Sequence, residues 1–67
     1  MNVYINNSLS TVADNSSIRE ALNAANITGE RGIAVAVNNE VVPRTDWENH
    51  ILNAEDNITV IKATQGG

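Results

Sequence analysis

The sequence predicts a small two-layer α+β domain, in which one main helix packs on one face of a mixed β-sheet. Two pairs of short alternating segments each meet at an Asn-Asn dipeptide, which is typical of β-hairpins. A single stretch between them has the 3.6-residue period of a helix. With 67 residues the chain can hold one domain, and a lone helix among hairpins has to cover one face of their sheet.

The first hairpin is expected to have strands near residues 2–6 and 8–12. Apolar and polar residues alternate in the first segment, and the Asn-Asn dipeptide at 6–7 suits a two-residue turn because asparagine tolerates positive φ. In the return segment Leu9 is the residue expected to point inward.

The segment after this hairpin predicts the main helix. Ser17 followed by Glu20 is a capping box, so the helix should begin there and end near Asn26. Its apolar stripe is narrow and would lie against the sheet, through Ile18, Ala21, Leu22 and Ala25.

The second half of the chain predicts another hairpin, a short helical turn and a last strand. Residues 33–37 and 41–42 flank the second Asn-Asn turn, and Pro43 ends the return strand because proline cannot donate to a ladder. A second capping box, Thr45 to Glu48, predicts a helical turn that packs Trp47 against the core edge. A final strand, "ITVIKA", runs into the C-terminal segment.

Composition excludes several classes of function. Four basic residues against eight acidic ones give a net charge of −4, and no basic cluster suited to nucleic acid or an acidic membrane is present. The chain has no cysteine, so it offers no disulfide framework or thiolate chemistry. A cytoplasmic protein that binds neither nucleic acid nor membrane is expected.

The residue types that usually carry catalysis are not grouped along the chain. His50 is the only histidine, the carboxylates are scattered over loops and caps, and no glycine-rich phosphate loop occurs. The protein is therefore expected to be no enzyme and to hold no metal or cofactor of its own.

The C-terminal residues are the one feature that suggests chemistry. Residues 1–63 are expected to form the domain, and residues 64–67 a flexible tail that ends in Gly66-Gly67. Glycine has no Cβ, so such an end could enter a channel too narrow for other residues and leave its carboxylate unshielded.

The sequence resembles the thiamine-biosynthesis sulfur carrier family, ThiS, over essentially its whole length. The resemblance rests on "AVAVNNEVVPR", on Trp47 after Pro43 and Arg44, and on the two terminal glycines. It implies a ubiquitin-like β-grasp with about five strands and the last strand in the middle of the sheet. Pro43, Arg44 and Trp47 match the family without a chemical role, and are expected to fix the loop after the fourth strand.

The resemblance also implies a role as a protein co-substrate. A ThiF-type adenylating enzyme would use ATP and magnesium to activate Gly67, while Gly66 and Gln65 thread the end into its active site. Sulfur from a cysteine desulfurase system would then give a C-terminal thiocarboxylate, and thiazole synthase would take that sulfur for the thiazole of thiamine.

The face of the sheet away from the helix is a candidate docking surface for these partners. If Ile33, Val35 and Val37 face the helix, alternation turns other residues outward, and one of Val60 and Ile61 must join them. The expected docking residues are Tyr4, Ala34, Ala36 and Ile61.

Two other functions stay open at the level of sequence. A sister carrier, such as the small subunit of molybdopterin synthase, would share the tail chemistry but usually has a longer chain and lacks the "VPR…W" match. A β-grasp binding module with an inert tail would share the fold alone. The identity of the downstream partner would distinguish the thiamine carrier from the sister carrier. Removal of Gly67 would distinguish a carrier from a binding module with an inert tail.

Overall fold

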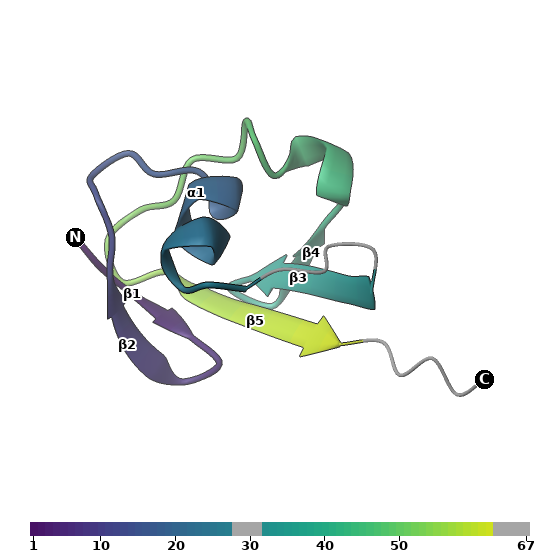
Figure 1. Cartoon of the computed structure of the whole chain (residues 1–67), viewed down its shortest axis with the longest axis horizontal. Helices are drawn as coiled ribbons and strands as arrows, with labels where there is room; N and C mark the ends of the chain where they lie inside the picture. The colour runs from purple at the N-terminus through teal and green to yellow at the C-terminus, as the bar shows by residue number, and fades with distance from the viewer. Residues whose placement is uncertain (28–31, 63–67) are drawn as a thin grey trace.

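Five strands form one mixed sheet in the order β2-β1-β5-β3-β4, with helix α1 packed on one face (Figure 1). The computed structural model describes residues 1–27 and 32–62. Along the chain the elements are β1 (Asn2–Ile5), β2 (Ser8–Thr11), α1 (Ile18–Ala24), β3 (Ile33–Val37), β4 (Glu40–Val42), the 3-10 helix η2 (Arg44–Asp46) and β5 (Asn57–Lys62).

The last strand lies in the centre of the sheet. β5 runs parallel to β1 on one side and antiparallel to β3 on the other, while the two hairpins form the flanks. This arrangement is the ubiquitin-like β-grasp, and it confirms the predicted fold, including the central last strand that periodicity alone did not indicate.

Both Asn-Asn dipeptides form the predicted hairpin turns. The φ angles are 51° and 68° at Asn6 and Asn7, and 51° and 71° at Asn38 and Asn39. Two successive positive φ angles define the tight turn whose twist matches antiparallel strands. Each turn therefore fixes the register of the hairpin that it closes.

The prediction that Leu9 points inward is wrong. Because the turn pairs Ile5 with Ser8, the next pair along the hairpin is Tyr4 with Leu9, and both side chains lie on the face away from α1. Leu9 is 60% exposed, and the inward residue that follows this strand is Val12.

Helix α1 begins as predicted. The Ser17 hydroxyl accepts from the Glu20 backbone N–H, and the Glu20 carboxylate accepts from the Ser17 N–H, which completes the capping box. The last helical residue is Ala24, and Asn26 has a φ of 60°, the left-handed conformation common after helix ends. Ile18, Ala21 and Leu22 are buried against the sheet, and Ala25 is half-buried.

The second predicted capping box does not form. η2 begins one residue before the expected cap, with Pro43 in the N-cap position and no side-chain capping bond. Thr45 is thus inside the turn, where its hydroxyl cannot cap it, and the turn is instead closed by the Asp46 N–H donating to the Pro43 carbonyl at 2.9 Å.

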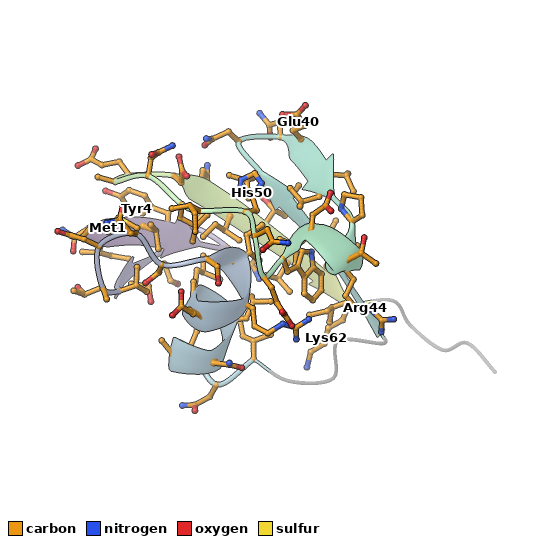
Figure 2. All side chains as sticks on the ribbon, turned by 90° about the horizontal axis from the view of Figure 1, so that it is seen from above. Met1, Tyr4, Glu40, Arg44, His50 and Lys62 are labelled. Atoms are coloured by element: carbon orange, nitrogen blue, oxygen red, sulfur yellow. The ribbon has the colours of Figure 1, made fainter. Side chains whose placement is uncertain are left out.

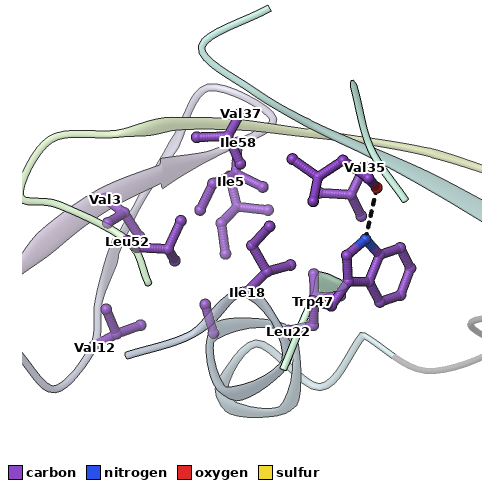
Figure 3. Packing of buried hydrophobic residues seen from close by; sticks show 12 residues of the cluster. Val3, Ile5, Val12, Ile18, Leu22, Val35, Val37, Trp47, Leu52 and Ile58 are labelled. Carbon is purple, nitrogen blue, oxygen red and sulfur yellow. Dashed lines mark hydrogen bonds between the residues drawn. The ribbon is translucent and has the colours of Figure 1, made fainter. Parts of the chain in front are cut away.

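The core lies between α1 and the sheet and is closed at one end by Trp47 (Figure 3). Trp47 is 1% exposed, and its indole N–H donates to the Val42 carbonyl at 2.9 Å, the bond drawn as a dashed line. Pro43 and Trp47 thereby fix the chain after β4, and Trp47 packs at one end of the core, as expected. No helix of the described residues is long and apolar enough to cross a membrane.

Candidate functional site

The buried polar side chains of the described residues have structural roles. Within 1–27 and 32–62, no three His, Cys, Asp or Glu side chains lie close enough to hold a metal ion. The buried Asp56 carboxylate accepts from the Asn53 backbone N–H and from the Asn38 amide, which is a structural role. The buried hydroxyls of Ser16 and Ser17 serve the turn and the cap before α1.

The residues predicted to carry the chemistry, Gln65, Gly66 and Gly67, lie outside the described residues, as does the predicted boundary after residue 63. The structure describes the strand that leads toward them. β5 pairs with β3 over five positions, from Ile58 opposite Val37 to Lys62 opposite Ile33. The chain therefore continues toward its C-terminus from the central strand of the sheet, which is paired with a neighbouring strand on each side.

The beginning of the chain and the described end of β5 lie at opposite ends of the molecule (Figures 1 and 2). Tyr4 and Met1 lie at one end, and Lys62, the last described residue of β5, lies at the other (Figure 2). The face away from α1, here called the open face, extends between these two ends.

The predicted docking residues do share the open face. Ile61 pairs with Ala34 across β5 and β3, and Ile61 is 58% exposed. Tyr4 is 38% exposed, Ala34 is exposed, and Ala36 is half-buried between its neighbours. Val60 turns toward the core, so Ile61 is the outward member of that adjacent pair, as alternation requires.

Two further apolar residues on this face were missed by sequence reasoning. Leu9 lies opposite Tyr4, and Val41, 71% exposed, lies opposite Ala36. Counting outward from each two-residue turn would have found both, because the turn fixes which residues face each other across a hairpin.

The strand residues of the open face are uncharged, and its exposed apolar side chains lie among the polar residues Asn2, Thr11, Asn57 and Thr59. Among the exposed large hydrophobic side chains of the described residues, all except Ile51 lie on it. No Asp, Glu, Lys or Arg of the five strands faces this way: Glu40 and Lys62 point to the opposite side, in register with Val37 and Ile33. On a chain with a net charge of −4, this absence of charge marks a surface suited to contact with another protein.

Comparison with known proteins gives consistent matches. A family model described as the ThiS family matches residues 3–67. The sulfur carrier protein ThiS of Escherichia coli strain K12 is 37% identical over 38 residues, which are 57% of this chain and 58% of that relative. The sequence match therefore spans a little under three fifths of that relative's length.

A solved structure matches over the whole length of both chains. The crystal structure of the thiamine biosynthesis protein ThiS from Geobacter metallireducens superposes with a TM-score of 0.85 at 26% sequence identity, covering 100% of each chain. The likeness in fold is thus more extensive than the likeness in sequence.

Proposed function

This chain belongs to the ThiS family, and on that premise we propose that it is a sulfur carrier of thiamine biosynthesis whose reactive group is the Gly67 carboxylate. The observation that carries the proposal is that the family match runs through residue 67 and so includes the terminal Gly-Gly. The chain acts as a protein co-substrate on which other enzymes work.

The proposed chemistry begins with activation of the terminal carboxylate. Because a C-terminal carboxyl ordinarily loses its proton at about pH 3.3–3.7, this group is an anion at neutral pH. One of its oxygens attacks the α-phosphorus of ATP, pyrophosphate leaves, and an acyl-adenylate forms. ATP and magnesium belong to the active site of the ThiF-type enzyme, so the carrier itself needs no cofactor.

Sulfur then replaces the adenylate. The terminal sulfur of a persulfide, supplied by a cysteine desulfurase system, attacks the carbonyl carbon of Gly67, and AMP leaves. A thiol cleaves the resulting sulfur–sulfur bond, is itself oxidised to a disulfide, and leaves the thiocarboxylate. Thiazole synthase then takes this sulfur for the thiazole ring. Cytoplasmic enzymes of this kind would meet the carrier in the cytoplasm.

Gln65 and Gly66 are proposed to lead the carboxylate into the partner's active site. Glycine adds no Cβ, so the backbone at Gly66 can pass close to the walls of a narrow channel. The four residues from Thr64 onward span at most about 13–14 Å when extended, which allows the domain to dock outside while its end reacts inside.

The open face is the proposed docking surface for both partners. Its exposed large hydrophobic residues come from four strands, and the core of a protein interface is depleted in charged residues as this face is. Ile61 lies on this face one residue before the described end of β5, so the surface borders the strand from which the reactive end continues.

The proposal is tested by following pyrophosphate release with ATP, magnesium and a ThiF-type enzyme that is active on its own carrier. Release is expected with the intact chain and not with a chain that lacks Gly67, while the truncated chain keeps its fold and its melting temperature. Equal release from both chains, or none from either, would contradict the proposal. No release from the intact chain, together with partner binding unaffected by the truncation, would favour the inert-tail binding module.

The nature of the downstream partner separates the two carrier functions. The proposal expects a complex with thiazole synthase, measured by analytical ultracentrifugation of the mixed proteins. A complex with the large subunit of molybdopterin synthase, and none with thiazole synthase, would assign the chain to the sister family.

A further inference from the structure

The ladder between β1 and β5 is extended by a side chain. Backbone pairing of the two strands covers Tyr4 with Asn57 and Ile5 with Ile58. The Asn6 backbone N–H still donates to the Ile58 carbonyl at 2.9 Å, but at this residue the chain turns away into the hairpin, with a φ of 51°. Without another contact, β5 would have no neighbour on this side beyond Ile58.

The Asn6 carboxamide takes the place of the missing strand. Its Oδ1 accepts from the Val60 backbone N–H at 2.8 Å, and its Nδ2 donates to the Val60 carbonyl at 3.2 Å. In a regular parallel ladder the Val60 N–H would donate to the backbone carbonyl of residue 6, and the Val60 carbonyl would accept from the backbone N–H of residue 8. An asparagine side chain is itself an amide with one acceptor and two donors, so it can supply both bonds where the backbone departs.

The second hairpin turn holds the other end of β5 in a related way. The Asn38 Oδ1 accepts from the Asn57 N–H at 3.0 Å, and its Nδ2 donates to the Asp56 carboxylate at 3.0 Å. The first asparagine of each turn thus fixes β5, Asn38 at its beginning and Asn6 near its described end.

We propose that Asn6 is a positioning residue for the sulfur-carrier reaction. It holds Val60 on the β1 side, where β5 has no backbone partner beyond Ile58, while β3 supports the other side, and so helps to order both Ile61 on the open face and the strand from which the reactive terminus continues. This inference rests on the proposed function. Asn6 touches no reacting atom. It acts by ordering β5 before binding, which reduces the conformational entropy that β5 loses when the partner enzyme binds.

Asn7 provides a matched control. It lies in the same turn with a φ of 68°, it is exposed, and no hydrogen bond from its side chain to the described residues of β5 is present. Glycine accepts positive φ at either position, so Asn6→Gly and Asn7→Gly both preserve the turn, and only Asn6→Gly removes the carboxamide that holds Val60.

The test combines amide hydrogen exchange with steady-state kinetics of pyrophosphate release by the ThiF-type enzyme. In Asn6→Gly the Val60 amide should exchange at least several times faster, and the KM for the carrier should rise roughly three- to tenfold with kcat unchanged, as expected for losing two modest hydrogen bonds. Asn7→Gly should match the unsubstituted chain in both measurements. Loss of global stability alone would not change KM at a temperature where every variant is folded.

A second substitution at the same position keeps the proposal testable if Asn6→Gly does not fold. Asn6→Asp keeps an acceptor for the Val60 N–H but places a carboxylate oxygen against the Val60 carbonyl, so it should also raise KM. An unsubstituted-like KM in either folded variant, with the unsubstituted chain itself activated, would overturn the role of Asn6. An unsubstituted chain that is never activated would instead contradict the proposed function, and the inference that rests on it.

Discussion

Trp47 is the core residue that combines a large buried surface with a hydrogen bond to the backbone. It is the largest fully buried residue, and its indole N–H satisfies the Val42 carbonyl where β4 ends. The Arg19 guanidinium lies 5.7 Å from the ring centroid and covers its outer side. Because a chain of this size has a small core, the loss of one contact of its buried aromatic residue should change the free energy of unfolding measurably.

Replacing Trp47 with Phe should lower the free energy of unfolding by about 1–3 kcal/mol, because the Val42 carbonyl loses its donor inside the core. Urea unfolding followed by circular dichroism measures the change. Val41→Ala, one residue earlier than Val42 but exposed, should stay within about 0.5 kcal/mol of the unsubstituted chain. Equal effects from the two substitutions would show that the indole bond contributes nothing.

Single residues also show where sequence reasoning loses precision. Alternation required one of the adjacent residues Val60 and Ile61 to point outward, and the structure shows that it is Ile61. The same reasoning failed for Leu9, because the predicted segment 8–12 holds a second apolar residue, Val12, three positions later, and alternation cannot turn both side chains to the same face. Only the pairing with Tyr4 across the turn decides where Leu9 points.

At the scale of elements, two similar motifs behave differently. Ser17 and Thr45 each precede a glutamate by three residues, yet only Ser17 caps a helix. Pro43 presets the φ of the N-cap position at −60°, so the turn begins before Thr45 is reached. A capping motif therefore locates a helical turn in this chain, whereas the residue that begins the turn depends on the proline upstream.

This difference can be measured directly. Ser17→Ala should cost about 1 kcal/mol of unfolding free energy, since it removes the acceptor for the Glu20 N–H at the start of a seven-residue helix. Thr45→Ala should change stability by less than about 0.5 kcal/mol. Thermal unfolding of both variants gives the comparison, and a larger loss for Thr45→Ala would contradict the assigned cap.

Elements bounded by local signals were predicted from the residues themselves, whereas their arrangement in the sheet was predicted from the family resemblance. The turns need positive φ and the helix needs a cap, so the asparagines and Ser17 identify them in the sequence. The central place of β5 depends on contacts between residues more than fifty positions apart, such as Tyr4 and Asn57. Periodicity carries no information about such pairing, and the family resemblance supplied it.

At the scale of the whole molecule, the distribution of charge distinguishes the two faces. The acidic residues that the structure describes lie on the helix, in loops and turns and, for Glu40, at the start of β4 on the opposite side of the sheet, while the strand residues of the open face are uncharged. A negatively charged chain that leaves one face uncharged in this way remains well hydrated elsewhere and can bury that face against a partner.

Placing a charge on the open face should weaken binding to the ThiF-type enzyme. Ile61→Glu and Leu9→Glu should each raise the Kd by about tenfold or more, equivalent to roughly 1.4 kcal/mol, because a carboxylate would be desolvated in the interface. Isothermal titration calorimetry measures the change. The control is Ile51→Glu, which substitutes another exposed isoleucine located beside the start of α1 and away from the open face.

The control should bind as the unsubstituted chain does, and all three variants should keep their secondary structure. An unchanged Kd for both open-face variants would exclude this surface from docking. Weak binding by Ile51→Glu alone would move the interface to the side of the molecule near α1.

The central claim is that Gly67 carries sulfur, and intact mass spectrometry tests it most directly. The chain is incubated with ATP, magnesium, a ThiF-type enzyme and a persulfide donor with thiol, and its mass is then measured. The account predicts a gain equal to the exchange of one oxygen for one sulfur, mapped to Gly67 and absent when that residue is deleted. An unchanged mass, with an enzyme shown to modify its own carrier under the same conditions, would contradict the account.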